Sequence, residues 1–288
     1  MRSEVTLAAL VVVLVTALPA QSVPAAIYTD PPADPAHPAA MQVLHIPSHG
    51  VSINGVLYTP SGSGPHPTIV ICHGFPGNEK NLDLAQAVRR AGWNAVTFNY
   101  RGSWGTPGSF RFAQNLEDAG AVMAFLRDPA NAAKFGVDTK RIVLAGHSMG
   151  GWVTALTAAH DHDLAGAILI SAADMGKVGE LERDKLVAET ADNMESLAGV
   201  TPESLANELA RNAKKWEFSN VVDGLRSMPL LVLSANDGLA PQTDALVQAI
   251  QSRGGHNVKS IHKPTDHSWS DQRIFLESTV IDWLSNLK

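Results

Sequence analysis

The chain has 288 residues, of which 45% are hydrophobic and 17% are charged. This balance is typical of a globular protein with a large core and excludes a disordered or fibrous chain. The formal net charge is −6, which gives no reason to expect a nucleic-acid partner.

The first 25 residues have the layout of a secretory signal peptide. Arg2 provides a positive start, residues 5–18 form an apolar run, and small residues place the predicted cleavage after Ala20, Ser22 or Ala25. The run is shorter than the roughly 20 residues of a membrane-spanning helix, so permanent membrane insertion is not expected; an uncleaved anchor is the alternative. We therefore expect a protein exported to the periplasm or secreted.

Residues 26–40 are rich in proline and are predicted to form an extended linker before a domain at residues 41–288. Cys72 is the only cysteine, so an exported protein of this sequence has no internal disulfide. The thiol stands in an apolar run, where a buried hydrophobic role is favoured over a reactive one.

Short β-branched runs alternate with helical patterns along the domain. Residues 41–46 and 51–59 predict an antiparallel hairpin, and the later predicted strands are 68–72, 95–99, 141–145, 167–171, 230–234 and 258–262. Helical patterns occupy residues 82–91, 116–127, 149–160, 242–253 and 271–286. The alternation predicts an α/β fold with a mostly parallel eight-stranded sheet and helices on both faces.

The alternation is interrupted between the strands at 167–171 and 230–234. Residues 178–197 and 202–216 predict two helices, with Thr201 as the cap of the second and Pro202 in its first turn. We expect an insertion at about residues 174–224 to form a small helical lid over the carboxyl edge of the sheet, where open α/β sheets bind ligands.

The segment Gly146-His147-Ser148-Met149-Gly150 matches the pattern G-x-S-x-G. Chance alone yields roughly 0.13 such matches in this composition, so the motif needs support from its surroundings. A predicted strand ends just before it and a predicted helix starts just after it, as a nucleophile elbow requires. Ser148 is therefore the predicted nucleophile.

A serine nucleophile needs a histidine base and a carboxylate that orients the base. Asp237 and His267 each follow a predicted strand, and the order Ser148, Asp237, His267 is the one expected for this arrangement. Asp174 is the alternative acid and His262 the rival base. Asp266 is too close to His267 in sequence to face its ring easily, and a loop-shaping role is expected for it.

Acyl transfer also needs donors for the developing oxyanion. The expected donors are the backbone N–H groups of Met149 and Phe75, the latter in the loop at residues 73–77. Trp104, Phe110 and Trp216 are candidates for an apolar substrate pocket, with packing against the body as the equal alternative.

These motifs together resemble the α/β-hydrolase superfamily, in particular its serine hydrolases similar to dienelactone hydrolases and acyl-peptidases. The resemblance rests on the HGFPG loop at residues 73–77, the segment at 99–105, the GHSMGG elbow, Asp237 in NDG and His267 in DHSWSD, and it extends over nearly the whole mature chain. It implies hydrolysis of esters, thioesters or amides through an acyl-enzyme without a cofactor. Dienelactone hydrolases carry cysteine at the elbow, so Ser148 argues against that particular activity.

The predicted function is hydrolysis of carboxylic esters, with a peptidase or amidase as the alternative and a non-catalytic protein that binds apolar ligands as the alternative from another class. The expected partner is a small-molecule ester or amide. We expect no cofactor and no metal, since the histidines and aspartates at residues 160–163 fit a solvated turn better than a metal site. The sequence leaves the oligomeric state open.

Overall fold

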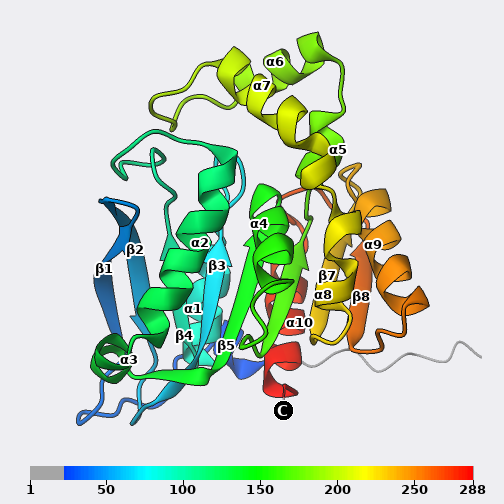
Figure 1. The fold of residues 1–288 in the computed structure, drawn as a ribbon. Coiled ribbons are helices and arrows are strands. Elements are labelled where there is room, and N and C mark those ends of the chain that lie inside the picture. Colours follow the sequence, from blue (N-terminus) through cyan, green and yellow to red (C-terminus); the bar gives the residue numbers. More distant parts are fainter. Residues whose placement is uncertain (1–22, 288) are drawn as a thin grey trace, which may run out of the picture.

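A computed structural model describes residues 23–287, which form a three-layer α/β domain (Figure 1). The sheet has eight strands in the order β1-β2-β4-β3-β5-β6-β7-β8. Their bounds are Ala40–Ser48 (β1), Val51–Thr59 (β2), His66–Cys72 (β3), Asn94–Phe98 (β4), Val137–His147 (β5), Gly166–Ile170 (β6), Leu230–Ala235 (β7) and Val258–Lys263 (β8). The predicted hairpin and all six later strands are present.

Strand direction divides the sheet into two parts. β1 pairs antiparallel with β2, and β2 pairs antiparallel with β4. All remaining neighbours are parallel, so the carboxyl ends of β3 to β8 meet at one edge. β4, β6 and β7 are buried over their whole length, as expected for strands covered on both faces.

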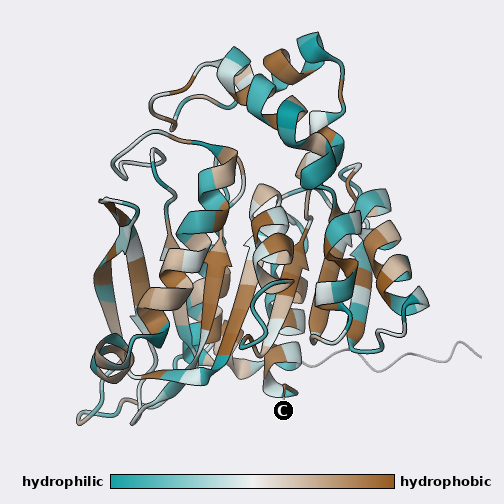
Figure 2. Ribbon diagram, viewed as in Figure 1, coloured by the Kyte–Doolittle hydropathy of each residue, from teal (hydrophilic) through white to brown (hydrophobic). Residues whose placement is uncertain are grey.

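Helices cover both faces of the sheet. Their bounds are Leu82–Arg90 (α1), Phe112–Arg127 (α2), Pro129–Phe135 (α3), Met149–Ala158 (α4), Val222–Leu225 (α8), Ala240–Ser252 (α9) and Arg273–Ser285 (α10). One hydrophobic core includes residues of α2, α4 and α9, and a second one lies beneath α1 and α10. Figure 2 shows mostly apolar strands in the sheet and helices that carry both apolar and polar residues.

The insertion between β6 and β7 contains α5 (Met175–Gly179), α6 (Arg183–Ala191) and α7 (Pro202–Asn212), which lie above the sheet (Figure 1). The prediction of one helix over residues 178–197 was wrong, because the chain turns between α5 and α6. The turn lets both short helices pack against α7. The helix predicted at 202–216 is α7 followed by a 3-10 turn at Ala213–Lys215, and the Thr201 hydroxyl accepts a hydrogen bond from the Ser204 N–H at 3.2 Å.

The predicted signal peptide lies almost entirely in residues 1–22, outside the described part of the chain. Residues Ala25–Ile27 form a 3-10 turn that contacts α1 and α10. Arg90 of α1 donates hydrogen bonds to the carbonyls of Ala26 and Ile27, the latter at 3.1 Å. The segment predicted as an extended linker therefore starts with a turn attached to the domain.

No helix within residues 23–287 combines the length and the apolar character that crossing a membrane requires.

Candidate active site

Ser148 stands at the junction between β5, which ends at His147, and α4, which begins at Met149. Its φ of 58° and ψ of −124° are unusual for a residue with a side chain, and such strain is typical of functional turns. Gly150 makes the turn possible, since a Cβ atom there would lie 2.1 Å from the Cys72 carbonyl oxygen. The partly exposed Ser148 thus has the backbone geometry of a nucleophile elbow.

Asp237 and His267 form a direct pair at the carboxyl edge of the sheet. The Nδ1–H of His267 donates to Asp237 Oδ2 at 2.8 Å, while Asp237 Oδ1 accepts from the Leu239 N–H at 2.9 Å. The Asp237 side chain is only 3% exposed, whereas that of His267 is 39% exposed. Burial acts to raise the pKa of Asp237, but hydrogen bonds from His267, Leu239 and Ser171 outweigh it, so the pKa is lowered and the carboxylate stays charged.

His147 links the elbow to the loop that carries His267. Its Nε2–H donates to the His267 backbone carbonyl at 2.8 Å, and the two ring centroids are 4.6 Å apart. Burial, and then the nearby His267, lower the pKa of His147 to about 4, so its ring is neutral near pH 7. Ser148, His267 and Asp237 therefore gather at one edge, although the Ser148 hydroxyl has no hydrogen-bond partner within residues 23–287. Catalytic hydrogen bonds are often long before substrate binds.

The rival residues are engaged in other contacts. Asp174 caps α5 by accepting from the Gly176 N–H at 2.9 Å, and it also accepts from the Phe218 N–H at 3.0 Å. Asp266 accepts from a backbone N–H within its own loop, and His262 bonds to the side chain of Asn236. None of these three is hydrogen-bonded to the His267 ring in the described part of the chain, which leaves Asp237 as its carboxylate partner.

The loop after β3 lies directly against Ser148. A Cβ atom on Gly74 would be 2.9 Å from Ser148 Cβ and 3.5 Å from Ser148 Oγ, so only glycine fits at this position. The next residue, Phe75, has a backbone N–H without an acceptor within residues 23–287. Met149 is the first residue of α4, and its N–H therefore has no acceptor inside the helix. Gly74 and Ser148 therefore approach each other closely, and each is followed by a predicted oxyanion donor, Phe75 or Met149.

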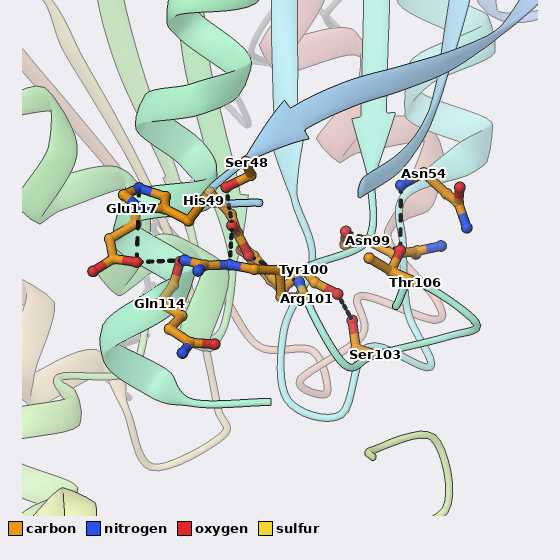
Figure 3. A network of polar contacts seen from close by, with 11 residues as sticks. Ser48, His49, Asn54, Asn99, Tyr100, Arg101, Ser103, Thr106, Gln114 and Glu117 are labelled. Atoms are coloured by element: carbon orange, nitrogen blue, oxygen red, sulfur yellow. Dashed lines mark hydrogen bonds and ion pairs between the residues drawn. The ribbon is translucent and has the colours of Figure 1, made fainter. Parts of the chain in front are cut away.

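A buried ion pair that the sequence did not predict supports the loop after β4. Arg101 donates from its backbone N–H and from Nε to the two carboxylate oxygens of Asp118, at 2.8 and 2.6 Å, and Ser48 donates to the same carboxylate at 2.6 Å. Arg101 also pairs with Glu117, as Figure 3 shows. A signal existed, since Asn115 and Asp118 interrupt the apolar face of α2.

Two of the three predicted pocket residues are packing residues. Phe110 and Trp216 are 1% and 2% exposed, and burial of this degree leaves them little surface for a substrate. Their rings belong to an aromatic cluster with Phe75, Phe112 and Trp152, whose neighbouring centroids lie 5.0–6.4 Å apart. Within this cluster, the Phe75 ring packs against the rings of Phe110 and Phe112.

Trp104, the third predicted pocket residue, is partly exposed and touches the loop after β3. Its Nε1–H donates to the Pro76 carbonyl at 2.7 Å, and the ammonium group of Lys80 lies 4.1 Å from its ring centroid. Trp104 therefore anchors the loop after β4 to the loop that carries Phe75.

Comparison with known proteins agrees with this architecture. A family model described as "Alpha/beta hydrolase family" matches residues 69–276, which is more than half of the chain. An uncharacterized 31.7 kDa protein of the traX-finO intergenic region of Escherichia coli is 34% identical over 122 residues, 41% of this chain and 40% of that protein. Quorum-quenching protein AidA of Acinetobacter baumannii is 31% identical over 137 residues, 46% of this chain and 43% of that protein. These matches span less than half of the relatives' length.

Solved structures share the fold at low identity. The acylaminoacyl peptidase of Pyrococcus horikoshii aligns with a TM-score of 0.66 and 17% identity over 86% of this chain and 41% of that one. Est1E of Butyrivibrio proteoclasticus aligns with a TM-score of 0.65 and 18% identity over 85% and 98% of the two chains. The protein thus has a hydrolase fold. The chain belongs to the α/β-hydrolase family.

Within residues 23–287, no group of three or more His, Cys, Asp or Glu side chains is arranged to hold a metal ion. In the turn at residues 160–163, Asp161 pairs with Arg127 at 2.7 Å.

Proposed function

We propose that the protein is a serine hydrolase that cleaves carboxylic ester bonds through an acyl-enzyme. The observation that carries this proposal is the position of a strained Ser148 at the same sheet edge as the Asp237–His267 pair, whose Nδ1 to Oδ2 distance is 2.8 Å. With Nδ1 donating to Asp237, the neutral imidazole of His267 has its acceptor at Nε2, the atom that a catalytic base uses.

In this mechanism, Ser148 Oγ attacks the ester carbonyl while His267 Nε2 takes the hydroxyl proton. The C–O bond to the leaving alcohol then breaks, and His267 returns the proton to the alcohol. Water attacks the acyl-enzyme in the same way, which releases the carboxylic acid and restores Ser148. The N–H groups of Phe75 and Met149 stabilise the oxyanion in both the acylation and the deacylation steps. One such donor lowers the activation barrier by about 3 kcal/mol.

A fluorophosphonate probe tests the nucleophile. Wild-type protein should be labelled at Ser148, and Ser148→Ala should lose the label while keeping its circular dichroism spectrum and melting temperature. Folded wild-type protein that stays unlabelled would contradict the proposal.

The bond that is cleaved is tested with matched substrates. We expect hydrolysis of p-nitrophenyl acetate and butyrate to exceed that of aminoacyl anilides, because an amide leaving group demands more exact protonation by His267. Faster hydrolysis of the anilides would identify a peptidase instead. Adding p-nitrophenyl octanoate to the substrate series measures the preference for acyl-chain length.

We also propose that the protein is exported, on the basis of the signal-peptide pattern in residues 1–25. Mass spectrometry of the protein purified from culture medium and from cell fractions should find a new N-terminus after Ala20, Ser22 or Ala25. Recovery of only the full-length chain from the cytosol would contradict export.

A further inference from the structure

A cavity separate from the catalytic residues lies at the β1–β2 edge of the sheet. Its volume is about 250 Å³, and its walls include residues of β1, β2, β3, β4 and the start of α1. Two apolar side chains on its rim are exposed to solvent, Val43 by 61% and Leu82 by 45%. Ser148, Asp237 and His267 do not line it.

Lys80 brings a positive charge to this cavity. Its Nζ donates to Asn99 Oδ1 at 3.1 Å and lies over the Trp104 ring, but no carboxylate pairs with it within residues 23–287. None of the residues that line the cavity is acidic. Burial lowers the pKa of Lys80, which reflects the cost of an ammonium group that is partly removed from water.

His73 adds a second polar group that lacks a partner. The residue lines the cavity and is 2% exposed, and its Nδ1–H donates to the Gly74 carbonyl at 2.8 Å. Its Nε2 has no hydrogen-bond partner in the described part of the chain. Because Nδ1 carries the proton, Nε2 of the neutral ring is a hydrogen-bond acceptor, so Lys80 is the only charged donor among the residues that line the cavity.

We propose that this cavity binds a small monocarboxylate, with its carboxylate on Lys80 Nζ and its apolar chain between Val43 and Leu82. A single cation among apolar walls suits one negative charge on a hydrocarbon better than a phosphate. At roughly 30 Å³ for one water, the volume corresponds to about eight heavy atoms, which is the size of hexanoate. Burial lowers the pKa of His73 to about 4, so its ring is neutral near pH 7 and adds no charge to the site.

The site does not depend on the proposed hydrolysis, although a carboxylate is also the acid that ester hydrolysis releases. The test therefore uses Ser148→Ala protein beside the wild type. Hexanoate is titrated into each protein and followed by the backbone NMR shifts of residues 43, 56, 80 and 82. We expect saturable binding with the same dissociation constant in both, below about 10 mM. Absence of saturable shifts at these residues would overturn the proposal and leave the catalytic assignment unaffected.

Two controls show whether charge is what the cavity recognises. Hexan-1-ol has the same chain without the charge and should bind at least about tenfold more weakly than hexanoate. Lys80→Met should weaken hexanoate binding by about tenfold. Lys134→Met should leave the binding unchanged, since Lys134 lies over the Phe135 ring away from the cavity. Equal affinity of the alcohol, or an unchanged Lys80→Met variant, would overturn the proposal.

A second pair of variants leaves Lys80 in place. Val43→Asp puts a negative charge on the rim of the cavity and should weaken hexanoate binding several-fold at 0.15 M salt. Met41→Asp places the same charge two residues away on the same face of β1, at a position that is 63% exposed but does not line the cavity, and its effect should be smaller. Equal effects of the two variants would indicate general repulsion and contradict a defined site.

Discussion

Asp237→Asn tests the role of the carboxylate in the proposed mechanism. The wild-type carboxylate accepts the Nδ1–H of His267 at 2.8 Å and is almost fully buried. Asparagine keeps the shape, but its NH₂ group, facing the ring, would require Nδ1 to become the acceptor. The proton would then sit on Nε2, and His267 could not accept the Ser148 proton. We expect kcat to fall by about 10³- to 10⁴-fold, as in other hydrolases with this triad.

Asp174→Asn is the matched control, because Asp174 is the other candidate acid. It caps α5 and accepts from the Phe218 N–H, so its loss should lower the free energy of unfolding by about 1–2 kcal/mol and leave kcat within about threefold. Steady-state hydrolysis of p-nitrophenyl butyrate and urea unfolding measure both quantities. If Asp174→Asn loses the activity and Asp237→Asn keeps it, the assignment of the acid is wrong.

Two further changes test the surroundings of the site. His147→Phe removes the N–H that bonds to the His267 carbonyl while keeping a ring; we expect kcat to fall by about tenfold with KM nearly unchanged, and an unaltered kcat would exclude a positioning role. Burial, followed by the charge of Asp83, raises the pKa of Glu277 to about 7 from 4.5. The stability that a raised carboxyl pKa confers is fully present below pH 4.5 and is lost as pH rises through 7. Glu277→Gln avoids this loss, so its unfolding free energy should exceed that of the wild type by about 2 kcal/mol at pH 8, with the difference vanishing near pH 4 in urea titrations.

The elbow could be predicted because its constraints are local. A strand, a tight turn and a helix follow one another within the segment around Ser148, and small residues stand where the turn leaves no space. Asp237 and His267 could be placed because each directly follows a predicted strand, and parallel strands bring their carboxyl ends to one edge. The order of strands across the sheet did not have to be known.

Features that depend on distant contacts were not predicted. The Arg101–Asp118 pair joins a loop to a helix, and the sequence around Arg101 does not indicate which acid it meets. For Phe110 and Trp216, the sequence left a role in a substrate pocket and a role in packing equally open. Only their burial in the assembled aromatic cluster distinguishes the two roles. α3 has local signals, since Asp128 caps it and Pro129 begins it, but seven residues are too few to show a helical period.

The lid illustrates why periodicity alone leaves a substrate site undefined. Its return segment, residues 194–200, has no helical or strand period, and residues 194–197 were predicted as the end of a helix. The Trp104 N–H donates to Ser196 at 3.0 Å, the Ala198 N–H to Gly102 at 2.8 Å, and the Phe110 N–H back to Ala198 at 2.9 Å. Each bond contributes about 1 kcal/mol, so the three together favour the attached position of the segment. The lid is therefore attached to the loop after β4 by backbone contacts between segments about 90 residues apart, which helical or strand periodicity does not reveal.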